Sequence, residues 1–381
     1  MRQAAFASSI LFGASIFVLG VAAAFKVIDF RTDARSTRDL VQGKSALAFE
    51  SHYNKEFPAR DLGVSLWAAI AYVLFKEGRP GIAIGGNDWL YTDEELKTYA
   101  DAEVQTQTHL ALMLWVREEL ARRGSALAVA VVPSKARVYP EHLGGHRPAS
   151  IHRDLYERIQ AELATGEMPQ IDLLGALTAA KGQQQTFLRT DTHWTPGGAQ
   201  VAAREIARAL KAAGLAGSGS TAYRTQTQSE QPHKGDLFNF LPLDPYFSAL
   251  LPPQEQIAVQ RTEAAGAGEV DLLGDGAEPA IALTGTSYSA DARWNFTGAL
   301  QESLREDVVN YAVEGKGPFV AMLEYLSRKD LPQTAPRVVV WEVPERFFPV
   351  AYDFSPYAAL LPPELVQQET VSKKKNAHGA H

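Results

Sequence analysis

The rest of this chain is organised around the segment Asp191-Thr192-His193-Trp194-Thr195-Pro196-Gly197-Gly198. Asp191 and His193 are separated by one residue, so an irregular or extended backbone can turn both side chains the same way. The carboxylate would then orient the imidazole. Thr195 is typical of a helix N-cap and Pro196 of a first helical position, which predicts a helix over 197–213. The pair would lie on a loop directly before that helix, a common location for catalytic residues.

Ser287 is the serine that best completes such a pair as a nucleophile. The apolar run 280–283 predicts a buried strand, and Gly285 allows the chain to turn sharply at its end. A helix that begins near Ser289 would add backbone N–H groups and the positive end of a helix dipole, which suits an oxyanion hole. Gly-Thr-Ser alone is typical of an ordinary turn. The Asp-x-His-Trp stretch is what favours the catalytic interpretation.

Several blocks of the sequence resemble the recurring blocks of the alginate O-acetyltransferase family. They are Asp191–Trp194, Gly285–Ser289, Val132–Glu141 and Trp341–Arg346, and they follow the family's order over residues 85–348. The resemblance implies an α/β fold, the SGNH-hydrolase-like three-layer fold with a central, mainly parallel sheet. It also implies a circular permutation, since the Asp-x-His block precedes the serine block. On this resemblance Ser287 is the nucleophile, His193 the base and Asp191 the carboxylate that orients the base.

Other residues are expected to bind substrate. The apolar run 126–132 predicts a strand with a central position in a parallel sheet, and Lys135 follows its carboxyl end, where open α/β sheets bind ligands. The polar and aromatic cluster 291–296 suits a sugar, and Arg293 would pair with a uronate carboxylate. Arg346 likewise follows a predicted strand at 337–341. The expected substrate-binding residues are Lys135, Tyr288, Arg293, Asn295 and Arg346.

The segment 233–241 offers a histidine with an aspartate three residues on. No second histidine lies nearby in the sequence, so we interpret the segment as a structural turn above apolar residues, and we predict no metal site. The resemblance adds that Asp236 belongs to a block near the site and would line it.

Composition sets outer bounds on the function. A chain of 381 residues with 46% hydrophobic content can bury one large α/β core or two modest ones. The absence of cysteine excludes disulfides, a thiol nucleophile and cysteine-ligated metals. A net charge of −7 argues against wholesale binding of a polyanion, so a uronic-acid polymer would need a local basic groove. We expect no cofactor and no nucleic-acid partner.

The amino terminus predicts export. No charged residue occurs from Gln3 to Phe25, and the run Phe6–Phe25 is long enough to cross a bilayer as a helix. Arg2 favours a cytoplasmic start, which places the remaining chain in the periplasm, anchored in the inner membrane. A cleaved signal peptide is the rival interpretation, since Ala22–Ala24 supplies small residues, and it would leave a soluble periplasmic protein. A buried core helix is the third.

The predicted organisation has four parts. Residues 1–27 form a signal anchor, 28–80 a membrane-proximal linker with helices, 81–350 the acetyltransferase domain and 351–381 a partly disordered tail. The apolar run 62–75 is short for a membrane span and predicts a core helix. The run 169–174 predicts a further strand.

The function implied by the resemblance is O-acetylation of an exopolysaccharide, most simply alginate, by acyl transfer through Ser287. The family works with a membrane-bound O-acyltransferase that supplies acetyl groups and with other polysaccharide secretion components. The short remainder after Arg346 has no room for the carbohydrate-binding domain of the longer soluble branch, so the chain resembles the membrane-anchored J-type branch. An acetyl esterase, an acetyltransferase for another polysaccharide such as cellulose, and a non-catalytic scaffold of a secretion complex remain alternatives.

Overall fold

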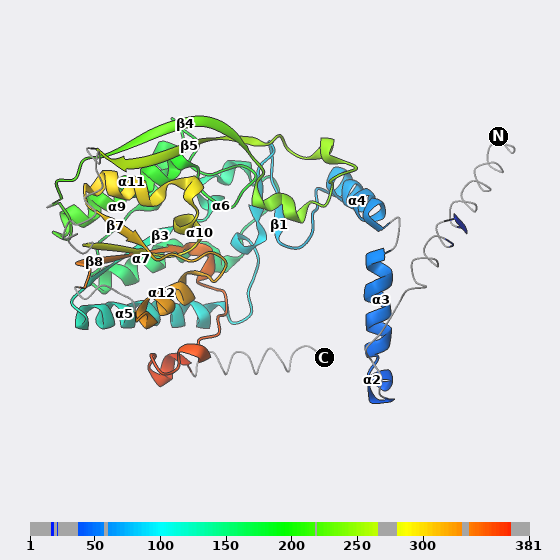
Figure 1. The fold of residues 1–381 in the computed structure, drawn as a ribbon, viewed down its shortest axis with the longest axis horizontal. Coiled ribbons are helices and arrows are strands. Elements are labelled where there is room, and N and C mark those ends of the chain that lie inside the picture. Colours follow the sequence, from blue (N-terminus) through cyan, green and yellow to red (C-terminus); the bar gives the residue numbers. More distant parts are fainter. Residues whose placement is uncertain are drawn as a thin grey trace, which may run out of the picture. The chain divides into compact units, whose positions relative to one another are not determined.

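The structure is a computed structural model that describes residues 37–56, 60–217, 219–265, 280–329 and 335–366, together with residues 17, 18 and 21 (Figure 1). The chain divides into two compact units. One unit comprises residues 1–78 with 241–251, and the other comprises residues 79–240 with 252–381. All residues of the candidate site belong to the second, larger unit.

The larger unit is built on a parallel sheet of four strands in the order β3-β8-β6-β7. These strands are β3 (Ala126–Val132), β6 (Ile281–Thr284), β7 (Val308–Asn310) and β8 (Val338–Pro344). The strand predicted at 126–132 is therefore confirmed, but its predicted central position is wrong for the described strands. β3 lies at the edge, and β8 lies between β3 and β6. The sequence of β3 is nevertheless a continuous apolar run, because helices cover both faces of this edge strand.

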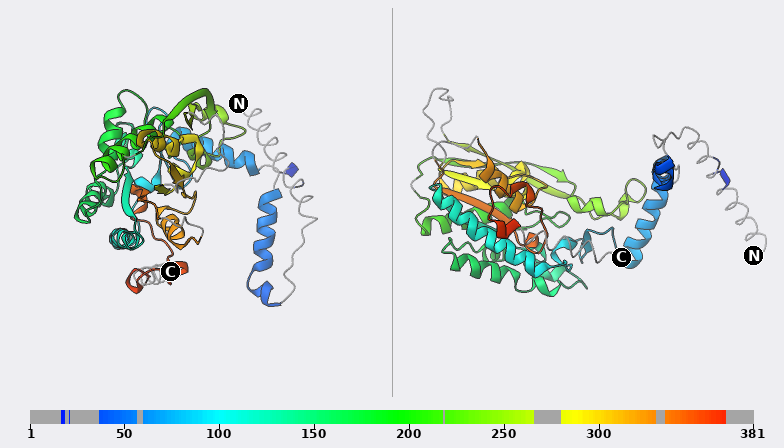
Figure 2. Two further views of the ribbon diagram at one scale, coloured as in Figure 1. Left: turned by 60° about the vertical axis from the view of Figure 1, so that its left-hand side comes forward. Right: turned by 90° about the horizontal axis from the view of Figure 1, so that it is seen from below.

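Two hydrophobic clusters form the core, one on each face of the sheet. The first joins the sheet to α8 (Leu173–Ala180), α9 (Pro196–Ala212) and α11 (Phe296–Leu304). The second joins it to α5 (Ala102–Arg122), α7 (Leu155–Thr165) and α12 (Pro318–Ser327). Figure 1 shows α9 and α11 on one side of the sheet and α5 and α12 on the other, and Figure 2 gives two further views of the same layers. The molecule is thus a helix–sheet–helix sandwich, as the α/β prediction requires.

Local sequence signals account for α9. The Thr195 side chain accepts a hydrogen bond from the Gly198 backbone N–H at 2.9 Å, and Pro196 is the first helical residue. The predicted helix start is confirmed. The strand predicted at 169–174 is wrong, because α8 begins at Leu173. The Asp172 side chain caps that helix by accepting a hydrogen bond from the Gly175 N–H at 2.8 Å. The prediction followed the short apolar run and did not use this capping residue.

Two antiparallel pairs complete the larger unit. β1 (Ile82–Ile84) pairs with β2 (Leu90–Thr92), and the long strands β4 (Tyr223–His233) and β5 (Glu255–Ala264) form a ribbon that packs on α11 and α9 (Figure 1). The domain extends beyond the expected boundary at residue 350, since Phe354 and Leu361 are buried in the second cluster. Residues 367–381, the rest of the predicted tail, lie outside the described residues.

The smaller unit contains α2 (Thr37–Val41), α3 (Lys44–Glu56), α4 (Arg60–Ile70) and a π-helical turn, Ala71–Phe75. The predicted core helix at 62–75 is helical, but it is not a core helix. Trp67 and Leu74 are 67% and 69% exposed. Most of the apolar run 6–25 lies outside the described residues. Within the described residues, the structure has no helix with the length and apolar character that a membrane crossing requires.

Candidate active site

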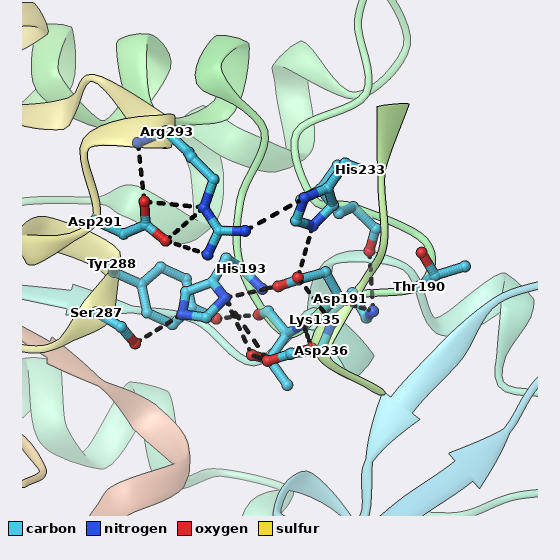
Figure 3. Close-up of polar contacts among 12 residues, drawn as sticks. Lys135, Thr190, Asp191, His193, His233, Asp236, Ser287, Tyr288, Asp291 and Arg293 are labelled. Atoms are coloured by element: carbon cyan, nitrogen blue, oxygen red, sulfur yellow. Dashed lines mark hydrogen bonds and ion pairs between the residues drawn. The ribbon is translucent and has the colours of Figure 1, made fainter. Parts of the chain in front are cut away.

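The structure brings Asp191, His193 and Ser287 into one hydrogen-bonded chain (Figure 3). His193 Nδ1 lies 2.6 Å from Asp191 Oδ1, and His193 Nε2 lies 2.7 Å from Ser287 Oγ. The His193 backbone N–H also donates to Asp191 Oδ1 at 2.9 Å, which closes a tight local turn. These distances fit a serine whose proton a carboxylate-oriented imidazole removes. The arrangement is that of a nucleophile, a base and an orienting carboxylate.

The serine turn is held by a carboxylate that lies beneath it. β6 ends at Thr284, and Ser287 opens the short helix α10 (Ser287–Ala290). The fully buried Glu342, on β8, accepts from the Thr286 backbone N–H at 2.7 Å and from Ser289 Oγ at 3.0 Å. Burial raises the pKa of Glu342, and these hydrogen bonds act against that rise. A Cβ on Gly285 would lie 2.8 Å from the Glu342 backbone oxygen, so the turn needs glycine.

Lys135, expected from the sequence to lie near a substrate groove, is buried beside the loop that carries Asp191 and His193, and its contact with substrate stays a prediction. Its side chain is 1% exposed, and Nζ donates to the backbone oxygens of Asp191, Leu188 and Arg189 at 2.7, 3.0 and 3.3 Å. Burial lowers the pKa of the Lys135 ammonium to about 8. Lys135 therefore holds the loop that carries Asp191 and His193.

Tyr288 and Arg346 are also buried, at 1% and 7% exposure, and the expectation that they contact substrate stays a prediction. The Tyr288 hydroxyl donates to the Thr192 backbone oxygen and accepts from Arg346 Nη1 at 3.1 Å. Arg346 Nε donates to Glu94 Oε2 at 3.1 Å. Burial raises the pKa of the Tyr288 phenol, so it stays protonated and remains a donor to the loop. Both residues therefore stabilise the site through hydrogen bonds to protein groups.

Arg293 and Asn295 lie nearer the surface. The Arg293 side chain is 55% exposed and pairs with Asp291, to which Nε donates at 2.8 Å (Figure 3). Asn295 has a left-handed backbone, φ 51°, just before α11, and its Nδ2 donates to Thr262 Oγ1 at 2.9 Å. Substrate contact by either residue stays a prediction.

Two residues of the segment 233–241 complete the environment of Asp191. His233 Nε2 lies 2.8 Å from Asp191 Oδ2, and the Asp236 backbone N–H donates to the same oxygen at 3.0 Å. Asp236 also accepts from the Thr192 backbone N–H at 2.9 Å, so it adjoins the site as the resemblance implied. Sequence reasoning missed His233 because its partner carboxylate lies 42 residues away. The sequence did offer one indication that His233 lies near the site, namely its proximity to the block that contains Asp236.

The electrostatics of Asp191 favour its charged form. Burial alone would raise its pKa, but hydrogen bonds from His193 and His233 outweigh burial and hold the pKa of this carboxyl below its ordinary value. A permanently ionised carboxylate is what an imidazole needs when it takes up a proton.

Ligand atoms of Asp191, His193 and Asp236 lie within 4.8 Å of one another, a grouping that offers a cation three donors. His193 Nδ1 and Asp191 Oδ1 already bond to each other. A cation bound there would have to displace the hydrogen bond that orients the imidazole, and the expectation of no metal stays a prediction.

Fold and site together define an SGNH hydrolase-like domain with a serine–histidine–carboxylate arrangement. Residues 82–345 match the family profile described as "SGNH hydrolase-like domain, acetyltransferase AlgX". The chain is 48% identical over 353 residues to the "Probable alginate O-acetylase AlgJ" of Azotobacter vinelandii, covering 92% of this chain and 89% of that protein. It is 47% identical to the Pseudomonas aeruginosa protein of the same name, covering 86% and 85% of the two chains.

A solved structure gives the same result. The O-acetyltransferase domain of Pseudomonas putida AlgJ superimposes with a TM-score of 0.69 at 45% identity, covering 77% of this chain and all of that one. The chain therefore belongs to the SGNH hydrolase-like acetyltransferase family that contains the AlgJ proteins. The family, the fold class and the J-type branch expected from the sequence are confirmed.

Proposed function

We propose that this chain is a periplasmic O-acetyltransferase that acetylates alginate, with Ser287 as nucleophile, His193 as base and Asp191 as orienting carboxylate. The observation that supports the assignment is the unbroken hydrogen-bonded chain from Asp191 Oδ1 through the imidazole to Ser287 Oγ. Alginate is proposed as the acceptor because the curated relatives that match most of this chain are named alginate O-acetylases.

The proposed reaction has two halves. As Ser287 Oγ attacks the carbonyl carbon of an acetyl donor, His193 Nε2 takes the hydroxyl proton, and Asp191 stabilises the imidazolium. The backbone N–H of Ser287, first residue of α10 and thus without an intrahelical acceptor, stabilises the oxyanion. The donor's leaving group departs with the proton from Nε2, which leaves acetyl-Ser287.

In the second half, a sugar hydroxyl loses its proton to His193 Nε2 and attacks the acetyl carbon. The bond to Ser287 Oγ breaks, Oγ takes the proton back, and the acetylated sugar leaves. Water in place of the sugar gives hydrolysis by the same steps, so a measurable acetylesterase activity follows from the proposal. Ser287 is partly exposed, which allows either acceptor to approach.

The proposal includes a location and partners. The apolar run Phe6–Phe25 would anchor the chain in the inner membrane. A membrane-bound O-acyltransferase would supply acetyl groups, and other polysaccharide secretion components would deliver the acceptor. These assignments draw on the family resemblance and on the hydropathy of the sequence.

The test compares the purified full chain with Ser287→Ala and His193→Ala, using a chromogenic acetyl ester and then polymannuronate with the same acetyl donor. Ser327→Ala is the matched control, since this hydroxyl donates to the Leu323 backbone oxygen on α12, remote from the site. Loss of activity in both site variants, with an active control, supports the assignment. Full activity of Ser287→Ala would overturn it.

The acceptor is tested separately. Acetylation of polymannuronate but not of cello-oligosaccharides, followed by mass spectrometry, is expected for an alginate enzyme. The reverse preference would replace alginate by another polysaccharide. Restoration of acetylation in a deletion strain by Ser287→Ala would favour the scaffold alternative.

A further inference from the structure

The carboxylate of Asp191 is saturated with hydrogen-bond donors. Oδ1 accepts from the backbone N–H and Nδ1 of His193, at 2.9 and 2.6 Å. Oδ2 accepts from His233 Nε2 and the Asp236 backbone N–H, at 2.8 and 3.0 Å. Asp191 is 1% exposed, so water contributes little. The buried Asp191 carboxylate therefore accepts hydrogen bonds from two imidazoles, one on each oxygen (Figure 3).

The proton positions follow from this geometry. An ionised carboxylate only accepts hydrogen bonds, so the His233 nitrogen that faces Asp191 Oδ2 must carry a proton. His233 is 5% exposed, and its other ring nitrogen, Nδ1, lies 3.4 Å from Arg293 Nη1. A guanidinium only donates, so Nδ1 must offer a lone pair. His233 is thus a neutral imidazole with its proton on Nε2.

Arg293 is itself held in place. Its Nε donates to both oxygens of Asp291, at 3.0 and 2.8 Å, and Nη2 pairs with the same carboxylate. The guanidinium also lies 5.0 Å from the ring centre of Trp294. The buried Trp294 stacks on His193 at 5.2 Å between ring centres and contacts His233 edge-on at 5.7 Å. One short segment, 291–294, therefore constrains both imidazoles of the site.

We propose that His233 is a positioning residue for the Ser287–His193–Asp191 site, and that Arg293 sets the tautomer in which His233 acts. The Nε2–H of His233 fixes the rotation of the Asp191 carboxylate, so that Oδ1 stays aimed at His193 Nδ1 while the imidazolium forms and decays. No proton leaves His233 in this scheme. The inference rests on the proposed function, because it gives His233 a role only if His193 is the base.

The kinetic test uses the full chain and a small chromogenic acetyl ester. His233→Leu removes the donor to Asp191 Oδ2 and is expected to lower kcat by about 10- to 100-fold, the usual effect of losing a hydrogen bond to a charged group. His233→Gln keeps an N–H donor near the position of Nε2 and is expected to restore most of that loss. The KM of the ester should change little in both variants.

Arg293→Gln separates positioning from substrate recognition. The ester has no carboxylate, so a fall in kcat with this substrate cannot come from lost recognition of a uronate. A normal kcat with the ester and a raised KM with polymannuronate would instead make Arg293 a substrate contact and overturn its proposed role. His109→Leu is the matched control, because His109 is a buried histidine on α5 that bonds to the Phe348 backbone oxygen.

A spectroscopic measurement reports on the tautomer directly. In protein labelled with ¹⁵N-histidine, the His233 ring, identified by its loss in His233→Gln, should show the pattern of the Nε2–H tautomer. Arg293→Gln should move this ring toward a mixture of tautomers. The Nδ1–H tautomer in the unmodified chain would refute the proposal even if the leucine variant failed to fold.

The two proposals fail in different ways. Inactive Ser287→Ala and His193→Ala together with unchanged kcat in His233→Leu would overturn the inference about His233 and leave the proposed function standing. Activity that survives in Ser287→Ala would overturn the proposed function, and the role of His233 with it.

Discussion

Replacing Lys135 with methionine removes a buried ammonium from the loop that carries Asp191 and His193. Nζ donates to three backbone oxygens of that loop, at 2.7, 3.0 and 3.3 Å. Methionine has a similar length and no donor. The substitution therefore leaves three carbonyl groups without their charged partner while the packing volume stays nearly the same.

The size of the effect near neutral pH is a difference between two opposing contributions. Three hydrogen bonds from a charged donor contribute about 1.5–3 kcal/mol each. Burial lowers the pKa of Lys135 from 10.5 to about 8, which corresponds to a cost of about 3 kcal/mol for the buried charge. The net loss of unfolding free energy in Lys135→Met is therefore about 1 to 6 kcal/mol.

The pH dependence of the stability difference between wild type and Lys135→Met gives a sharper prediction, because its sign follows from the direction of the pKa shift. The folded chain releases the Lys135 proton from about pH 8, whereas the unfolded chain keeps it up to 10.5. Between these values the unfolded state binds more protons, so the stability of the wild type rises with pH. Lys135→Met lacks this contribution, and the stability difference should widen by about 2 kcal/mol from about pH 7 to about pH 9.5.

Urea denaturation followed by tryptophan fluorescence at both pH values measures this difference. The matched control is Lys97→Met, which removes an exposed lysine from an ion pair with Asp93 and should cost less than about 1 kcal/mol, with no widening. A stability difference for Lys135→Met that stays constant or narrows at alkaline pH would refute the assignment of Lys135 as a buried, desolvated ammonium. Ester hydrolysis by the folded variant should also slow, since the Asp191 loop has lost its anchor.

Further substitutions test the supports of the site. Gly285→Ala places a Cβ 2.8 Å from the Glu342 backbone oxygen, so thermal denaturation should show a large loss of stability and ester hydrolysis should fail; a wild-type melting temperature would contradict this. Arg346→Met removes the donor at 3.1 Å from the Tyr288 hydroxyl and should cost about 1–3 kcal/mol in urea denaturation, with a lower kcat. Asp191→Asn should abolish most of kcat and destabilise the protein near neutral pH. Because the pKa of Asp191 is held below its ordinary value of 3.8, the wild-type advantage should shrink as the pH falls below about 4, and a constant difference would argue against this.

Elements whose signals are local could be predicted from the amino-acid sequence. Thr195 and Pro196 mark the start of α9 because a capping hydroxyl and a fixed φ angle act within one turn of helix. The apolar run 126–132 specified β3 because a strand buried on both faces needs apolar side chains at every position. The sequence blocks around Asp191 and Ser287 identified the candidate triad residues, since the sequence gives the residue types and their order along the chain.

The exposure of a side chain, and its contacts with residues far away in the sequence, depend on the folded arrangement of the elements. Lys135, Tyr288 and Arg346 follow strands or adjoin the serine, a location that fits a substrate contact and a buried support equally well. Their burial depends on what packs over them. The prediction of a core helix at 62–75 was wrong for the same reason. The apolar pattern indicates a helix, but it does not show whether another part of the protein packs against that helix.

His233 shows the limit most clearly. It meets Asp191 because β4 ends at His233 beside the first residue of β5, Glu255, which accepts from the Thr190 backbone N–H at 2.9 Å. A Cβ on Gly235 would lie 2.0 Å from the Thr190 backbone oxygen, so the two segments also approach closely enough to require glycine. Ribbon register and backbone proximity are set by contacts between residues far apart in the chain. The sequence thus determined the chemistry of the candidate triad, and the fold alone decided what surrounds its carboxylate.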